Sequence, residues 1–421
     1  MALASRVAQA VPFYYGWVVV AVGAAANTSR VVGSVEVASV FVAALIAEHG
    51  WSSTLLATAT FIGSAGSALG GPFIGRVLDR RGPRLVTPIG TTLVAVSCFA
   101  LAATDSVLFY IAFYGMVRMA GQGFVQFSSQ ITTAKWFERR RGRAIALLSL
   151  VSSAGLALAP PLAQAVIANA GVAMGWAVFG FIALLLGTLP SALLLARRPE
   201  DMGLEPDGVR RQPGTRSGIS APARTADGGD YTLREAARTP ALWLIVPAVF
   251  MISAVMTGYG FHQLAFYVER GIPASTGAAV ISVFALGFSA GGVTWGALAD
   301  RFSAQALLTV LYAAGAGLML VLLNVEAAGE AFGAAFAFGF MVGGSIQLPI
   351  LLLASYFGRA HLGAIGGATH MARGFGLGGG PLIAGLIIDF HGYEAAWMAL
   401  AAMSGLAAVF MGLAKRPRPA G

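Results

Sequence analysis

Three arginines lie inside long apolar runs of the sequence: Arg30, Arg118 and Arg373. If these runs cross a bilayer, each ionised guanidinium costs at least ~2.5–3.5 kcal/mol at mid-depth, so it needs a partner or a function. The planar fork of N–H donors on a guanidinium matches the two oxygens of a carboxylate. We therefore expect these side chains to bind an anion.

Each of these arginines has a polar neighbour three or four residues away, which places the two on one helix face. The neighbours are Asn27, Gln122 and His370. Four further polar residues interrupt apolar runs in the second half of the chain: Tyr259, His262, Gln263 and Gln347. We expect all seven to contribute to a substrate-binding site together with the arginines.

Acidic residues do not balance this positive charge. We expect Glu36 near the outer end of the first apolar run, and the other candidates also fall at run ends: Asp105, Glu269, Glu326, Glu330 and Asp389. Should Glu36 lie deeper, it would pair with Arg30 instead. Without such pairing, an anionic substrate supplies the missing charge. Proton symport would need a titratable group (His262, His370, Glu36 or the substrate acid), whereas anion exchange would need none, and the sequence does not choose between them.

The composition predicts a protein that is solvated by lipid. Apolar residues make up 57% of the 421 residues and charged residues only 11%, whereas a soluble domain carries roughly 25% charged residues. Most of the 55 glycines lie within apolar runs, where small residues let helices approach closely. A single cysteine, Cys98, excludes an internal disulfide and a cysteine-based metal cluster. We find no phosphate-binding loop or metalloprotease motif and expect neither enzymatic activity nor a cofactor.

Twelve apolar runs are long enough to span a hydrocarbon core, which needs about 20 helical residues. They are 14–35, 53–74, 85–104, 107–133, 144–168, 173–196, 240–266, 275–298, 304–325, 329–354, 362–388 and 394–414. The polar stretch between the sixth and seventh runs predicts a linker, with a short amphipathic helix at 231–238. The sequence therefore predicts an all-α membrane protein of twelve transmembrane helices in two six-helix bundles, residues 1–196 and 239–421, joined by a cytoplasmic linker at 197–238.

The distribution of cationic residues predicts the orientation. If both halves have six spans, 23 of the 27 lysines and arginines fall on the side of the two termini, and only Arg270 falls in the opposite loops. Cationic loops stay in the cytoplasm, so we expect both termini there, in a bacterial inner (plasma) membrane. The net charge of +9 is then explained by the cationic cytoplasmic loops, and a nucleic-acid partner is not expected.

Two loops carry the same pattern, Gly-x-x-x-Asp-Arg, after the second span of each half. This pattern resembles the signature loop of the major facilitator superfamily, and the loop at 136–144 is also similar to one of that superfamily. The resemblance covers essentially the whole chain and implies a gating or conformational role for the loop residues, which are Gly75, Asp79, Arg80, Gly82, Arg84, Asp300 and Arg301.

The resemblance further implies alternating access around a midplane site, with the first, fourth, seventh and tenth spans lining the cavity and the third, sixth, ninth and twelfth acting mostly as scaffold. Three segments resemble the bacterial monocarboxylate porter and oxalate:formate antiporter group: 13–17, 198–208 and the Pro160-Pro161 pair. The eighth span, 275–298, departs from that group because it lacks an arginine. The glycines of 374–380 are interpreted as a packing surface in preference to a hinge.

These inferences predict a monomeric secondary transporter for a small organic anion, in the first place a monocarboxylate, driven by proton symport or anion exchange. The alternative is efflux of drugs or xenobiotics by a major facilitator antiporter. Such antiporters usually hold deep acidic residues for cations, so the surplus of arginine argues against cationic drugs. A receptor would be expected to carry a soluble signalling domain longer than this linker.

Overall fold

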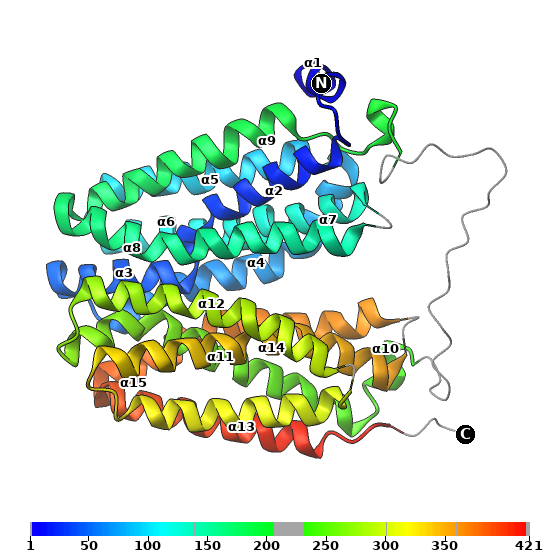
Figure 1. The fold of residues 1–421 in the computed structure, drawn as a ribbon. Helices are drawn as coiled ribbons and strands as arrows, with labels where there is room; N and C mark the ends of the chain where they lie inside the picture. Colours follow the sequence, from blue (N-terminus) through cyan, green and yellow to red (C-terminus); the bar gives the residue numbers. More distant parts are fainter. Residues whose placement is uncertain (1, 138–139, 206–230, 300, 359–360, 418–421) are drawn as a thin grey trace. The chain divides into compact units, whose positions relative to one another are not determined.

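The computed structural model describes residues 2–137, 140–205, 231–299, 301–358 and 361–417, and these contain helices and no strand (Figure 1). The elements are α1 (Ala2–Ala10), α2 (Gly16–Ser29), η1 (Val31–Gly33), α3 (Val35–His49), α4 (Ser53–Arg81), α5 (Pro83–Ala102), α6 (Val107–Met119), η2 (Ala120–Gln126), α7 (Phe127–Trp136), α8 (Arg141–Ile182), η3 (Ala183–Thr188), α9 (Leu189–Leu194), η4 (Glu200–Met202), α10 (Leu233–Ala236), α11 (Pro240–Glu269), α12 (Ala274–Ala299), α13 (Ala304–Leu322), α14 (Ala328–Phe357) and α15 (Leu362–Leu413).

Two long helices each supply two spans because they bend sharply at a glycine. Gly171 (φ 82°) bends α8 and Gly392 (φ 80°) bends α15. Only glycine adopts such positive φ angles at little steric cost. Both bends fall in the predicted gaps between apolar runs. With α2 and α3 as one interrupted span, and α6 to α7 as another, the twelve-helix fold class is confirmed.

The two halves of the sequence repeat with a constant offset of 221 residues. The repeat includes the bend glycines, two further glycines of positive φ and a tryptophan that is fully buried in both copies. The pairs are Gly50 and Gly271, Gly75 and Gly296, Asp79 and Asp300, Arg80 and Arg301, Pro160 and Pro381, Gly171 and Gly392, and Trp176 and Trp397. One constant spacing across loops, bends and core positions indicates two copies of a single structural unit.

The helices form two compact units. The first unit comprises residues Met1–Val37, Gly66–Ala159 and Val166–Arg224. The second comprises Ala38–Ala65, Pro160–Ala165 and Thr225–Gly421. Residues Ala38–Ala65, from the first half of the sequence, thus pack with the second unit. The division into 1–196, 197–238 and 239–421 stays a prediction.

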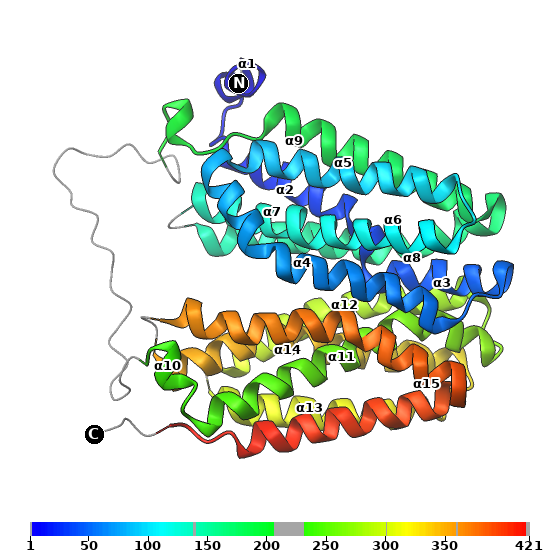
Figure 2. The same cartoon turned by 180° about the vertical axis from the view of Figure 1, so that it is seen from behind.

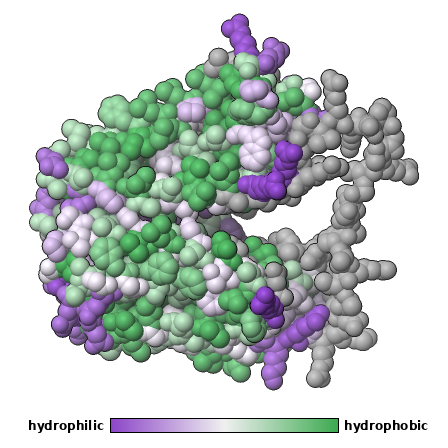
Figure 3. Space-filling view, viewed as in Figure 1, coloured by the Kyte–Doolittle hydropathy of each residue, from purple (hydrophilic) through white to green (hydrophobic). Residues whose placement is uncertain are grey.

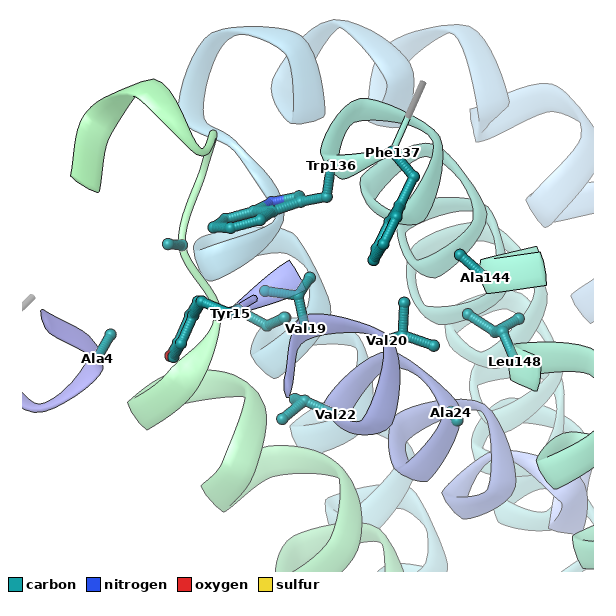
Figure 4. Close-up of a cluster of buried hydrophobic side chains, with 12 residues drawn as sticks. Ala4, Tyr15, Val19, Val20, Val22, Ala24, Trp136, Phe137, Ala144 and Leu148 are labelled. Carbon is teal, nitrogen blue, oxygen red and sulfur yellow. The ribbon is translucent and has the colours of Figure 1, made fainter. Parts of the chain in front are cut away.

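An aromatic cluster fixes the start of α2 in the first unit (Figure 4). The Tyr14 hydroxyl donates to the Trp136 carbonyl at 3.0 Å, and the Tyr15 hydroxyl donates to the Leu194 carbonyl at 2.7 Å. A side chain at Gly16 would overlap the Tyr14 ring. The 13–17 segment therefore joins the start of α2 to the ends of α7 and α9.

Glycines let helix pairs approach closely in the second unit. Cβ atoms at Gly376 and Gly380 would overlap the backbone carbonyls of Phe250 and Ala254, so α15 lies directly against α11 (Figure 2). Such close approach supports van der Waals packing where no hydrophobic force drives helices together. The packing interpretation of 374–380 is confirmed for these two positions.

Large apolar side chains are exposed along the flanks of the helices, whereas polar side chains gather toward the helix ends (Figure 3). Examples on the spans are Leu69, Leu108, Leu158, Val293 and Phe390, which are 65–80% exposed. Seven helical stretches among the described residues are each long and apolar enough to cross a membrane, and the shorter α2 is also apolar. Lipid is the solvent that such flanks require.

The described end of the linker contains a short capped helix, as the sequence predicts. The Thr232 side chain accepts from the Glu235 N–H, and the Glu235 carboxylate accepts from the Thr232 N–H, forming a capping box at the start of α10. These hydrogen bonds hold the pKa of Glu235 below its ordinary value. The rest of the linker, 206–230, lies outside the described residues.

Candidate functional site

The first span is broken where its arginine lies. Helix α2 ends at Ser29, the backbone turns through η1, and Ser34 is extended (φ −74°, ψ 156°) before α3 begins. The Ser34 hydroxyl accepts from the Val37 N–H at 3.4 Å, as an N-cap does. The expectation that this span ends near residue 35 is wrong, because helical backbone resumes there and runs to His49.

The position expected for Glu36 is therefore also wrong. Glu36 lies in the first turn of α3, inside the interrupted span, where it is half-buried and interacts electrostatically with Arg30 and Arg118. A carboxylate there is also favoured by the helix dipole. The alternative that Arg30 has an acidic neighbour is thus the one that the structure supports. One carboxylate thus lies near two guanidiniums in this group.

Arg118 is anchored by the break in the first span. It is 2% exposed, and its Nη1 donates to the Gly33 carbonyl at 2.5 Å. The turn at η1 presents this carbonyl to a side chain of α6. Arg30 is half-buried, and its Nε donates to the Asn27 side-chain oxygen at 3.0 Å. The structure thus brings Asn27, Arg30 and Arg118 into one polar group.

Gln122 lies in η2, a π-helical segment directly after α6. A side chain at Gly121 of the same segment would contact Arg30, with its Cβ 3.4 Å from that of Arg30. Gln122 itself is half-buried. Its predicted place on the face of Arg118 assumed 3.6 residues per turn, a spacing that a π-helical turn does not keep.

Two tyrosines that the sequence analysis did not select also belong to this group. Tyr110 and Tyr114 are buried, their rings are stacked with centroids 5.4 Å apart, and both interact electrostatically with Arg118. With Arg118 they follow a spacing of four residues along α6. The same rule that selected Gln122 could therefore have found them.

Three predicted site residues of α11 are packed inside the second unit. The Tyr259 hydroxyl pairs with that of Tyr267 at 2.5 Å, and its ring contacts Phe338 and Trp397. His262 Nε2 lies 3.0 Å from the Pro381 carbonyl, so this nitrogen is the donor. These contacts account for the Tyr259 hydroxyl and for one imidazole nitrogen, whereas His262 Nδ1 has no hydrogen-bond partner among the described residues.

Gln263 is fully buried as well, and its Nε2 donates to the Gly260 carbonyl at 2.9 Å. The neighbouring N–H of Leu264 donates to the Ser39 hydroxyl at 2.8 Å. The side chains of Gln263 and Ser39 thus form hydrogen bonds with backbone groups of α11. A substrate contact for Tyr259, His262 or Gln263 stays a prediction.

Arg373 of α15 has a different environment. Its side chain is half-buried, and in the part of the chain that the structure describes it forms no hydrogen bond or ion pair. Its electrostatic neighbours are Tyr312 and His370. His370 is exposed, one turn earlier on the same helix. The side chain of Gln347 lies outside the description.

The signature loop is built around Gly82, which has a φ of 82° and precedes α5. A Cβ at Gly82 would lie 2.6 Å from Arg197 Cγ, so the arginine that begins the linker packs over this turn. Arg80 is exposed and Arg84 is half-buried. Gly75 and Asp79 lie in the last turns of α4, Arg301 is an exposed turn residue between α12 and α13, and Asp300 is outside the described residues.

Repeated helical halves, apolar flanks and buried charged groups define a polytopic helical membrane transporter. The Major Facilitator Superfamily profile matches residues 17–378, and the chain belongs to that superfamily. The sequence is 24% identical over 358 residues to the "Uncharacterized MFS-type transporter YhjX" of Escherichia coli (strain K12), covering 83% of each chain. It is also 24% identical over 352 residues to an "MFS-type transporter" of Gibberella moniliformis, covering 82% of this chain and 78% of that one.

A solved structure shares the fold. A bacterial homolog of the human lysosomal transporter Spinster, crystallised in an inward-facing and unoccupied conformation, superposes with a TM-score of 0.71. The match covers 97% of this chain and all of that chain at 14% sequence identity. At this identity the likeness concerns the fold alone. Membership of the monocarboxylate and oxalate group stays a prediction.

Proposed function

We propose that this transporter carries a small organic anion, in the first place a monocarboxylate, by alternating access. The supporting observation is an unbalanced positive charge among groups that lipid cannot solvate. In the second unit, Arg373 meets no carboxylate in the described residues, and its neighbours are a phenol and an imidazole. In the first unit, Glu36 lies near the two guanidiniums of Arg30 and Arg118. A carboxylate substrate would supply the missing negative charge.

Coupling has two possible forms. Glu36 is a titratable group placed beside two cations, and it could release a proton as an anion leaves or accept one as an anion arrives. Proton symport then needs no further residue. Anion exchange would use the same cationic groups and keep Glu36 ionised throughout. A pH gradient drives the first process and not the second.

The proposal includes the orientation and the assembly. Both termini and the linker lie in the cytoplasm of a bacterial cell, the protein sits in the inner membrane, and it acts as a monomer. The lipid bilayer and the substrate are its partners, with protons as coupling ions in the symport form. The excess of arginine and lysine on the side of the termini supports this orientation.

One observation favours the alternative of drug or xenobiotic efflux. Glu36 lies deep in the first span, and a deep carboxylate is what a carrier of organic cations needs. The two guanidiniums beside it repel such a cation. The two functions therefore predict opposite charge preferences for the ligand.

The decisive experiment is a thermal-shift screen of the purified full chain in detergent. It compares carboxylic acids with their primary amides and with lipophilic cations of similar size. Stabilisation by an acid and not by its amide supports the proposal, and Arg373→Gln should weaken it. Stabilisation by cations alone would reject the organic-anion function. Uptake of the hit into proteoliposomes with and without a pH gradient then separates symport from exchange.

A further inference from the structure

The start of α11 carries an exposed tryptophan close to two exposed arginines. The side chain of Trp243 is 66% exposed, although the rest of this helix is covered along its length. Only residues near the two ends of α11 are exposed, and these are Pro240, Trp243, Val268 and Glu269. The exposure of Trp243 therefore belongs to the end of the helix and not to its flank.

The length of α11 places Trp243 at the surface of a membrane. The helix has 30 residues, whereas a hydrocarbon core of ~30 Å needs about 20. A centred helix therefore extends beyond the core by about five residues at each end. Trp243 is the fourth residue of α11, so its ring lies at the level of the lipid headgroups. Tryptophan is enriched at this level in membrane proteins.

Hydrogen bonds fix the indole against the segment that precedes α11. The Trp243 Nε1 donates to the Ala237 carbonyl at 2.8 Å. The N–H of Ala237 donates in turn to the Leu233 carbonyl at 2.9 Å, so the exposed Leu233 lies one helical turn from this contact. Because the indole N–H is already satisfied within the chain, the exposed part of the ring offers apolar surface.

Arg234 and Arg238 supply the charge of this segment. They lie four residues apart on a helical turn, which places their side chains on one face. Both are exposed, and within the described residues neither forms a hydrogen bond or an ion pair. The neighbouring carboxylate of Glu235 accepts from the Thr232 N–H and hydroxyl at 2.7 and 2.9 Å. The two guanidiniums therefore keep their donors for an anion from outside the chain.

Further cations lie at the same end of the second unit, where α10 is seen in both views (Figures 1 and 2). The Tyr231 N–H donates to the Phe357 carbonyl at 3.0 Å, which holds the segment at the end of α14. The hydroxyl of the adjacent Tyr356 donates at 2.7 Å to the carbonyl of the residue before Lys415. Lys415 and Arg416 are both exposed. This end of the unit is thus complementary in charge to anionic headgroups.

We propose that Leu233, Arg234, Arg238 and Trp243 form a binding surface for an anionic phospholipid. The guanidiniums bind the headgroup phosphate, and the leucine and the indole lie against the glycerol and the adjoining part of the acyl chains. In the orientation proposed above, this lipid belongs to the cytoplasmic leaflet. The bound lipid holds the start of α11 at the membrane surface. The inference goes beyond the proposed function, because it does not depend on the substrate.

The test measures lipid binding to the purified full chain in a neutral detergent. Phosphatidylglycerol and phosphatidylcholine with identical acyl chains are titrated separately, and binding is measured by native mass spectrometry and by the melting temperature. We expect the wild type to bind phosphatidylglycerol more tightly, and added salt to reduce the difference. Arg234→Gln/Arg238→Gln should bind phosphatidylglycerol roughly tenfold more weakly or worse.

The matched control is Arg143→Gln/Arg198→Gln, which removes two exposed arginines of the first unit and should bind phosphatidylglycerol as the wild type does. Trp243→Ser should weaken the binding of both lipids, because the apolar contact is lost. Val268→Ser, at the other end of the same helix, should leave binding unchanged.

Three results would reject this lipid site. They are equal affinity of the wild type for the two lipids, equal losses in the two double-arginine variants, and stabilisation by inorganic phosphate that matches stabilisation by the lipid. In the first two cases the arginines act only through the general charge of the cytoplasmic side. None of these results bears on organic-anion transport, and a failure of the carboxylate screen would leave the lipid site standing.

Discussion

Asp389, near the end of the eleventh span, accepts a hydrogen bond from the backbone N–H of Ser53, the first residue of α4, at 3.0 Å. Its second oxygen accepts from the N–H of Thr54 at 2.9 Å. Asp389 thus acts as an N-cap supplied by a helix more than 300 residues away in the sequence. Both helix ends belong to the second unit, so this contact ties residues Ala38–Ala65 to α15.

Replacing Asp389 by alanine should destabilise the second unit. A lost N-cap costs about 0.5–2 kcal/mol, here at an exposed carboxylate. We expect a lower melting temperature of the purified protein in detergent. The control is Glu394→Gln, which breaks the exposed ion pair with Arg270 (2.9 Å) and should change stability by less than about 1 kcal/mol. Equal effects of the two variants would contradict the capping role.

A glycine is needed at position 392 because of the backbone conformation there and not because neighbouring atoms leave no room for a side chain. Its φ is 80°, and a Cβ there would meet nothing within 4 Å. Gly392→Ala should therefore destabilise the bend by about 1 kcal/mol or more. Gly317 of α13 also has open space around its Cβ but lies within a regular helix, so Gly317→Ala should be neutral or stabilising. Melting temperatures that shift in the same direction would refute the conformational argument.

A glycine is needed at position 291 because the neighbouring helix leaves no room for a side chain. A Cβ there would overlap the carbonyl of Phe340, and Gly343 on the facing helix meets Phe288 in the same way. Helices α12 and α14 therefore approach through reciprocal glycines. Gly291→Ala should cost about 1–3 kcal/mol because it overpacks this contact, again visible in thermal unfolding. A melting temperature equal to that of the wild type would show that the two helices separate without penalty.

The fold could be predicted from the sequence because each span is a long apolar run and each gap holds a charge, a proline or a glycine. The bend glycines Gly171 and Gly392 lie in such gaps. The break at Arg30 could not be predicted in this way, because hydropathy ignores whether the backbone is continuous. Counting about 20 helical residues from the start of the first apolar run placed Glu36 near the outer end of the span. Ser34, followed two residues later by a glutamate, was the available signal of a new helix start.

The candidate site was predicted less well than the fold because side-chain direction depends on local helix geometry. The structure joins Arg30, Arg118 and Asn27, all of which the sequence analysis selected. It packs the Tyr259 ring against other aromatic rings. The sequence shows only that a polar atom interrupts an apolar run and does not show which residues surround it.

Glu36→Gln should separate the two forms of coupling. The variant keeps the shape of the side chain and removes its charge, leaving Arg30 and Arg118 without their acidic neighbour. If Glu36 carries the coupled proton, uptake driven by a pH gradient should fall at least tenfold in proteoliposomes, while exchange of internal for external anion continues.

The control for this variant is Glu48→Gln, an exposed position on the same helix, which should transport as the wild type does. The unliganded Glu36→Gln protein should also be less stable, because the negative charge beside the guanidiniums of Arg30 and Arg118 is removed. A saturating carboxylate should restore part of that stability, since it brings the missing charge. Gradient-driven uptake at the wild-type rate in Glu36→Gln would exclude this carboxylate as the proton carrier and leave His262, His370 and the substrate acid as candidates.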